Sequence, residues 1–257
     1  QYRGKITADQ LDGRRQADLV SYIAQEAKVE KITFRHVLCV LDIFSRFMWT
    51  RKLRNASTEA VTKAFESILD SSGRRPIEMN VDKGAEFKSA KFRTMLDTRL
   101  INNLRVAEGK NDIATLDRAI ATLKLLITTR TITAGAGNWA QELKTATASY
   151  NDTGHTHLDM EAPRTVKDND QLQFQLQVQA GKDHDEQDNM ARKRNKKMTE
   201  GASFRVEEVS KLKGFAMARS FKPRFQEQIR QFAPDQTRPR TGDTSRTQRA
   251  TPHSNPE

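Results

Sequence analysis

The chain has 257 residues, with 44 Lys and Arg against 33 Asp and Glu, and a formal net charge of +11. This length suffices for one substantial core and a small extra domain, and the basic balance favours a polyanionic partner, most often nucleic acid. The single cysteine, Cys39, excludes an intrachain disulfide framework and a multi-cysteine zinc site, and we expect it to be buried.

The sequence also limits where the chain is expected to act. It has no apolar run near the ~18 residues of a membrane span, so we expect no membrane partner. Residues 1–5 lack the apolar stretch of a signal peptide, which favours an intracellular protein. The chain begins with Gln1 and not with Met, as a fragment of a longer protein would.

Apolar runs in the first third of the chain predict three strands and a helix. Residues 16–20 predict a first strand, and the nearly unbroken apolar run 32–44 is typical of a central strand covered on both faces. Residues 47–53 follow closely enough to form a hairpin with it. Ser57 is placed to cap a helix, because an apolar stripe of helical spacing follows. That stripe consists of Val61, Ala64, Phe65 and Ile68.

The middle of the chain continues with alternating strands and helices. Residues 77–82 predict a strand, 89–98 a short helix and 100–106 another strand. Asn111 or Asp112 then caps a helix whose apolar residues are spaced 3, 4, 3 and 4 apart. These residues are Ile113, Leu116, Ile120, Leu123 and Ile127.

Two further helices complete the predicted core. One runs from Trp139 to about Tyr150, and a short one begins at residues 162–164 with Pro163 in its first turn. We expect Trp49 and Trp139 to be core residues. The order of elements predicts a mixed α/β sheet in which the chain changes direction after the hairpin.

The last third of the chain is polar. Residues 182–188 are acidic and 192–197 are basic, which indicates a linker or an exposed helix. Residues 204–225 contain short β-like apolar runs, and 234–257 lack aromatic and branched aliphatic residues, so the tail is expected to be disordered. The predicted division is an extension (1–14), a core (15–170), a polar linker (171–200), a partial β domain (201–232) and a disordered basic tail (233–257).

Residues 77–87 carry the most informative pattern, an apolar run followed by Asp82, a glycine and an aromatic residue. This order places a carboxylate at the carboxyl end of a strand, where an open α/β sheet meets its ligands. Asp18 and Asp117 stand in positions that can join it. Three convergent carboxylates form a site for two divalent cations, which suits phosphodiester chemistry. The alternative is that these acids only cap strands and helices.

Six segments, in order, resemble the integrase core of retroviruses and long-terminal-repeat retrotransposons, within the wider DDE transposase and integrase superfamily. The segments are 16–20 (QADLV), 37–49 (VLCVLDIFSRFMW), 81–87 (VDKGAEF), 116–124 (LDRAIATLK), Trp139 with 150–158 (YNDTGHTHL) and 162–163, and 204–225. The resemblance covers about residues 5–225. It implies an RNase H-like fold, a mixed five-stranded sheet flanked by helices, followed by a small SH3-like domain.

The resemblance also implies a reaction. Asp18, Asp82 and Asp117 are then both the catalytic residues and the ligands of two Mg²⁺ or Mn²⁺ ions. The expected activity is DNA 3′-processing and strand transfer, with element ends and target DNA as partners. Integrases of this type generally act as multimers, so a homo-oligomer is expected, and a DNA substrate implies the nucleus.

Basic residues near the acids and in the polar segment are the candidate DNA contacts. Lys124 lies two helical turns beyond Asp117, on nearly the same face, where it can reach a phosphate. The run 192–197 would give salt-dependent, sequence-independent contacts, and a solvated linker is the alternative. The candidates are Lys83, Lys124, Arg192, Lys193, Arg194, Lys196 and Lys197.

Three departures from the family pattern keep a rival function open. The third acid is Asp117, whereas the family usually has glutamate, which is longer by about 1.5 Å; 34 residues (83–116) separate it from Asp82. Residues 13–15 stand where an aromatic residue is common, and the family's zinc-binding amino-terminal domain is missing, either lost or outside this fragment. The main rival is therefore a catalytically degenerate or domesticated copy that binds DNA, and a nuclease of the same fold is a third possibility.

Other polar residues have competing interpretations. Asp42 competes with Asp18 as the first acid, but the family has no ligand at its position. Glu86 either supports the loop after Asp82 or is simply exposed. His155 and His157 are interpreted as loop residues and not as metal ligands.

Overall fold

The computed structural model describes residues 6–107, 112–133 and 138–197. It divides the chain into two compact units, residues 1–187 and 188–257, and we describe each by itself. The predicted β domain (201–232) and disordered tail (233–257) lie outside the described residues. Within the described part, no helix has the length and apolar character needed to cross a membrane.

A five-stranded mixed sheet forms the centre of the first unit, in the order β5-β4-β1-β6-β7. The strand β4 is antiparallel to β1 and to β5, whereas β6 runs parallel to β1 and β7 parallel to β6. The strands are β1 (Arg14–Ser21), β4 (His36–Asp42), β5 (Met48–Leu53), β6 (Glu78–Val81) and β7 (Asn103–Val106). The predicted mixed five-stranded sheet is thereby confirmed.

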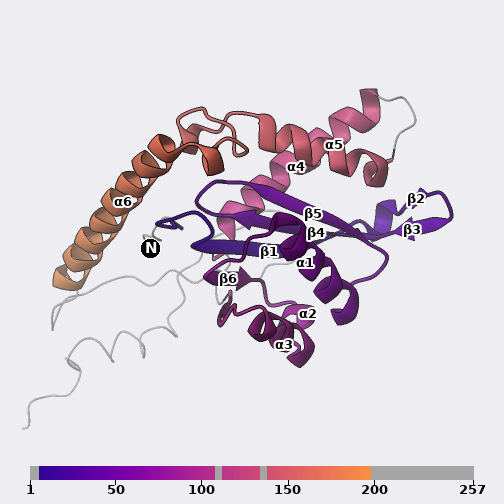
Figure 1. Cartoon of the computed structure of the whole chain (residues 1–257), viewed down its shortest axis with the longest axis horizontal. Coiled ribbons are helices and arrows are strands. Elements are labelled where there is room, and N and C mark those ends of the chain that lie inside the picture. The colour runs from indigo at the N-terminus through magenta and orange to yellow at the C-terminus, as the bar shows by residue number, and fades with distance from the viewer. Residues whose placement is uncertain (1–5, 108–111, 134–137, 198–257) are drawn as a thin grey trace, which may run out of the picture. The chain divides into compact units, whose positions relative to one another are not determined.

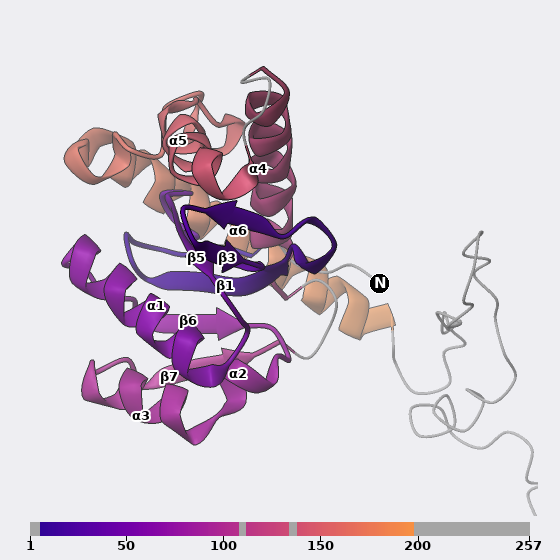
Figure 2. The ribbon, with the colours of Figure 1, turned by 90° about the vertical axis from the view of Figure 1, so that its right-hand side faces the viewer.

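Helices cover both faces of the sheet, as Figure 1 and Figure 2 show. Helices α4 (Ala114–Thr133) and α5 (Trp139–Asp152) pack on one face, and α1 (Thr58–Ser72), α2 (Ala85–Lys88) and α3 (Ala90–Thr98) lie on the other. Each side has its own apolar core. The apolar residues 37–41 of β4 contribute to both, because alternate residues of a strand point to opposite faces. All seven residues of β4 are buried.

Local signals in the sequence explain where three helices begin. The hydroxyl of Ser57 accepts a hydrogen bond from the amide of Ala60, and that of Ser89 accepts one from Phe92. Asn138 and Gln141 form a reciprocal capping box at the start of α5. These side chains satisfy amides that have no partner within their own helix. The predicted helix starting at Ser57 is confirmed, as is burial of its apolar stripe.

The structure corrects three predicted elements. The run 32–44 does not form one strand: β3 (Ile32–Phe34) pairs with β2 (Ala27–Val29) in a separate ribbon, and β4 starts after Arg35. The predicted helix at Pro163 is a series of tight turns that leads to the 3₁₀ helix η3 (Val166–Asp168). The strand predicted at 100–106 begins only at Asn103, because Leu100 has a positive φ of 58°.

The segment predicted to be a linker or an exposed helix forms α6 (Asp170–Lys197). Its first turns contribute Leu172, Leu176 and Ala180 to the buried residues of the first unit. Leu172 and Leu176 share a small apolar cluster with Phe44. The compact unit therefore extends to residue 187, beyond the predicted core boundary at 170. An apolar residue every third or fourth position explains this packing.

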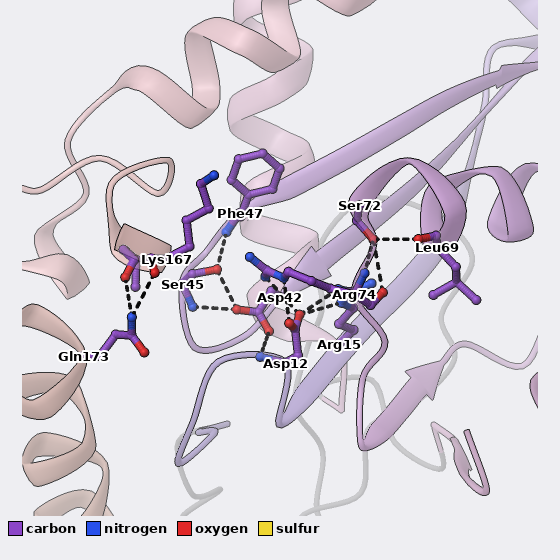
Figure 3. A network of polar contacts seen from close by, with 11 residues as sticks. Asp12, Arg15, Asp42, Ser45, Phe47, Leu69, Ser72, Arg74, Lys167 and Gln173 are labelled. Carbon is purple, nitrogen blue, oxygen red and sulfur yellow. Dashed lines mark hydrogen bonds and ion pairs between the residues drawn. The ribbon is translucent and has the colours of Figure 1, made fainter. Parts of the chain in front are cut away.

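A polar network ties down the start of β1 (Figure 3). The guanidinium of Arg15 is fully buried, pairs with Asp12 at 2.6 Å and lies 4.3 Å from the centroid of the Trp49 ring. Asp12 also pairs with Arg74 at 2.7 Å. Trp49 was expected in the core, but it is only half-buried and packs against these cations. A charge buried in this way needs a paired and hydrogen-bonded partner.

Gln16 joins β1 to the start of α4. Its side-chain nitrogen donates to the carbonyl of Asp112 at 2.9 Å, and its oxygen accepts from the amide of Leu116 at 3.0 Å. Gln16 is fully buried, so both ends of its amide replace water with protein partners. The side chain of one strand residue therefore satisfies the backbone at the beginning of a distant helix.

We expect Gln16→Ala to lower the free energy of unfolding by about 2–4 kcal/mol, because two buried backbone groups lose their partners and a cavity remains. Gln16→Glu should also destabilise, since a carboxylate cannot donate to Asp112. Chemical denaturation measures both. The control is Gln177→Ala, an exposed glutamine on α6. A cost for Gln16→Ala no larger than for this control would contradict the role of the bridge.

Candidate active site

Three elements bring the predicted acids to one end of the sheet. Asp18 lies in β1 two residues after Gln16, so both side chains are on the face covered by α4. Asp82 directly follows β6, whose last residue Val81 pairs in parallel with Ala17. Asp117 lies in the first turn of α4, one residue after the amide that Gln16 binds. The structure thus brings the three predicted acids together.

The electrostatics of Asp18 report this proximity. Burial, together with the charges of Asp82, Asp117 and Glu86, raises the pKa of its carboxyl to about 6. The hydrogen bond from the amide of Leu19 opposes this shift. The pKa of Asp117 is also raised, by burial and by the charge of Asp82. Carboxylates that raise one another's pKa are typical of functional sites.

The absence of a side chain at Gly84 leaves room for the carboxylates of Asp82 and Glu86. Its φ of −54° is open to any residue, so the backbone does not require glycine. A Cβ at this position would lie 2.6 Å from Oε1 of Glu86 and 2.9 Å from Oδ1 of Asp82. The amide of Gly84 donates to the same oxygen of Asp82 at 2.9 Å. Glu86, which was predicted either to support this loop or to be exposed, therefore belongs to the acidic site.

The residue types fit a hard divalent cation, because Mg²⁺ and Mn²⁺ prefer carboxylate oxygens. Among the described residues, however, no three His, Cys, Asp or Glu side chains converge closely enough to hold a metal ion. Binding of a cation would therefore require these carboxylates to turn toward one another. Asp18 and Asp82 are half-buried and Asp117 is exposed, so their side chains have room to rotate.

Asp42, the competing first acid, is engaged elsewhere. It is fully buried, and its oxygens accept hydrogen bonds from the amides of Asp12 and Ser45 and from the Ser45 hydroxyl. Burial raises its pKa, and the hydrogen bonds from Ser45 oppose the shift. These bonds fix the turn between β4 and β5, so the carboxylate is not available to a ligand.

The predicted DNA-binding residues are distributed over both units. Lys124 is exposed on α4. Burial raises the pKa of the Cys39 thiol, the charge of Asp18 raises it further and that of Lys124 lowers it, so both charges act on the same residue of the sheet. Lys83 is exposed beside Asp82. Arg192 and Lys193 are exposed on α6 in the second unit. The side chains of Arg194, Lys196 and Lys197 lie outside the described part of the chain.

The two histidines lie in the segment after α5. The pKa of His155 is lowered by burial, and its ring contacts Tyr150 edge-on with centroids 4.8 Å apart. His157 is exposed in the 3₁₀ helix η2 (Thr156–Leu158). Cys39 is fully buried, in agreement with its predicted packing role.

Sequence reasoning missed Gln16, which positions both Asp18 and α4. The available signal was a polar residue within a buried strand, two positions before a candidate ligand and hence on the same face. Such a residue needs a hydrogen-bond partner from a neighbouring element. It also missed that Gly84 provides space for carboxylates in addition to a turn.

Comparison with solved structures identifies the fold. A chain of the simian T-cell lymphotropic virus intasome in complex with PP2A regulatory subunit B56 gamma aligns with a TM-score of 0.51 and 16% identity, over 65% of this chain and 56% of that one. The HTLV-2 integrase catalytic core domain in complex with magnesium (trimeric form) aligns with a TM-score of 0.49 and 15% identity, over 64% of this chain and 99% of that one. The catalytic core domain of BIV integrase aligns with a TM-score of 0.46 and 12% identity, over 60% of this chain and 93% of that one.

No family model matches the sequence, and no curated protein matches it. At these identities the structural likeness concerns the fold alone. The first unit has the fold of a retroviral integrase catalytic core, as the resemblance of its sequence implied.

The raised pKa of Asp18 predicts a pH dependence of stability. Because this pKa is about 6 when folded and near 4 when unfolded, the folded protein binds more protons between these pH values, and stability falls as pH rises through them. In chelator, Asp18→Asn should raise the free energy of unfolding by about 1–2 kcal/mol at pH 7, after allowance for solvent screening, and by little at pH 4. Asp185→Asn on exposed α6 is the control. An equal gain at both pH values would contradict the raised pKa of Asp18.

We expect Gly84→Ala to weaken Mn²⁺ binding by about tenfold or more, because the new Cβ displaces the oxygens of Asp82 and Glu86. The melting temperature should change by only a few degrees, since the backbone conformation suits alanine. Titration calorimetry and thermal unfolding measure the two effects. Gly181→Ala is the matched control, because no atom lies within 4 Å of its Cβ. Unchanged Mn²⁺ affinity would show that Gly84 does not shape a cation site.

Proposed function

We propose that this chain is an integrase of a mobile element, a polynucleotidyl transferase that carries out DNA 3′-processing and strand transfer. The observation that supports this best is the electrostatic coupling of Asp18, Asp82 and Asp117 on an integrase core fold. In the reaction, a water or a DNA 3′-hydroxyl attacks a phosphodiester in line with the leaving oxygen.

In this proposal, the three aspartates hold two Mg²⁺ or Mn²⁺ ions. When bound, the ions supply charge that activates the attacking oxygen and stabilises the leaving one. The chain itself supplies rigidity: Asp18 and Asp82 stand at equivalent levels of adjacent parallel strands, and Gln16 holds the first turn of α4 beside them. Misplacement by ~1 Å costs about 100-fold in rate in such sites, so this bracing is part of the function.

The DNA backbone is the proposed partner of the nearby cations. Lys124 lies on α4 close enough to Asp18 for both charges to act on Cys39, so it can hold a phosphate beside the acids. Lys83 adjoins Asp82, and Arg192 and Lys193 add exposed charge to the second unit. Element ends and target DNA are the proposed substrates, a homo-oligomer is the proposed state, and the nucleus is the proposed location.

The second candidate is an integrase fold that binds DNA without catalysis. Two observations favour it: Asp117 is shorter than the glutamate usual in the family, and no three acidic, histidine or cysteine side chains of the described residues converge as a metal site. Metal binding discriminates between the two candidates. A working site should bind Mn²⁺ through all three aspartates, and a relic should not bind it.

The test is incubation of the full chain with a labelled DNA duplex and Mn²⁺, beside Asp82→Asn and Asp117→Asn. We expect metal-dependent joining that falls by at least 10³-fold in each variant, because removing a metal-bound carboxylate removes the charge on which two-metal catalysis depends. Thermal unfolding with and without Mn²⁺ gives a second readout: only the unmodified chain should be stabilised by the ion.

Each other result has a distinct meaning. Cutting without joining would identify a nuclease of the same fold. DNA binding without cutting by any variant would favour the relic. Joining by Asp82→Asn at an unchanged rate would refute the proposed triad.

A further inference from the structure

A cavity of about 820 Å³ lies in the first unit, beside the first turns of α4. Its walls come from the first half of α4, the end of α5 with the segment that follows it, and the first part of α6. None of Asp18, Asp82 and Asp117 lines it. Exposed side chains such as Thr156, Gln175 and Gln179 form part of the lining, so solvent and ligands can reach the interior. Its volume falls within the usual range of ligand pockets.

Arg46 supplies an unsatisfied charge to this cavity. It lies in the turn between β4 and β5, where Asp42 and Ser45 hold the backbone and Arg46 takes a φ of 60°. Its Nη1 is shielded from solvent and has no hydrogen-bond partner in the described structure. Burial lowers the pKa of its guanidinium to about 10, so it remains charged at neutral pH. A buried donor without a partner is destabilising, so a ligand that supplies an acceptor would be favoured here.

A second cation faces the same space. Arg118 on α4 lines the cavity, and its charge lowers the pKa of Arg46, which places the two guanidiniums near one another. Arg118 donates to the carbonyl of Ala114, and neither arginine forms an ion pair with any described residue. Two neighbouring cations that form no ion pair with a described residue attract an anion.

The remaining polar groups suit an anion near the two arginines. His155 also feels the charge of Arg46, and burial lowers its pKa, so near pH 7 its ring is neutral. Tyr150 lines the cavity next to Arg46, and its pKa is raised to about 12 by burial, so its hydroxyl stays protonated.

The acids of the cavity do not neutralise Arg46. Asp159 and Asp183 line the cavity, but Asp42 is the carboxylate whose charge acts on Arg46. The oxygens of Asp42 accept hydrogen bonds from Ser45 and Asp12, and burial raises its pKa. It therefore supplies no acceptor to the free Nη1 of Arg46.

We propose that this cavity binds a phosphate group through Arg46 and Arg118, at a site separate from the three aspartates. Guanidinium groups match the geometry and charge of phosphate oxygens better than those of other common anions. The phosphate belongs either to a free phosphorylated molecule or to the DNA backbone. In the second case the inference also rests on the proposed function.

Titration calorimetry of the full chain with inorganic phosphate, in chelator to remove divalent cations, tests the site. Arg118→Gln should weaken phosphate binding about tenfold, because it removes one charged donor from an exposed position where folding is not at risk. Arg46→Lys, checked by thermal unfolding, should also weaken it, since an ammonium lacks the planar donor pair. Arg93→Gln on exposed α3 is the control for net charge.

A second arm measures affinity for a DNA duplex over a range of salt concentrations. If a backbone phosphate occupies the cavity, Arg118→Gln should reduce the slope of log affinity against log salt by about 1, and Arg93→Gln should not. Loss of phosphate binding with an unchanged slope would identify a free phosphorylated ligand. Equal phosphate affinity and equal slopes for Arg118→Gln and Arg93→Gln would overturn the proposal. Asp82→Asn should retain phosphate binding, which separates this site from failure of the proposed function.

Discussion

The fold depends on the buried amide of Gln16, which joins the central strand to the start of α4. The two hydrogen bonds span 96 and 100 residues of sequence, so they connect parts of the chain that no local signal brings together. Because Gln16 and Asp18 share one face of β1, docking the helix and placing the first acid opposite the third are a single geometric event. A register shift of one residue in β1 would turn both side chains to the other face and abolish both.

The sheet contains two kinds of acidic residue, and their environments separate structural roles from candidate functional ones. Asp42 is completely buried yet accepts three hydrogen bonds, and Asp12 pairs with two arginines, so both stabilise the start of β1. Asp18 is less buried; burial raises its pKa, and the charges of neighbouring carboxylates raise it further. Repulsion of this kind is retained in proteins mainly where a ligand relieves it, at a cost in stability.

Most of the core was predictable because its signals are local. The apolar runs of β1 and β4, the stripe of α1 and the spacing of α4 all indicated the correct elements. The break at Arg35 was not predictable, since an apolar run does not reveal that β3 leaves the sheet to pair with β2. The three acids were predicted from the order of motifs and from the resemblance, and their catalytic role stays a prediction. The roles of Gln16, Gly84 and Arg46 depend on contacts across the fold, which a sequence pattern does not specify.

The strand order of the sheet has a consequence for how the chain reaches its native state. The antiparallel pairs of β4 with its neighbours close short loops, whereas the parallel pair of β1 and β6 must wait for α1, and Gln16 must wait for residues near 116. Contacts between residues far apart in the sequence tend to form late, because closing a long loop lowers the entropy of the chain before the contact can stabilise it. We therefore expect the carboxylates to approach one another only after both apolar cores have begun to pack. Their repulsion is then expected to oppose only a late step of folding, after most of the sheet has formed.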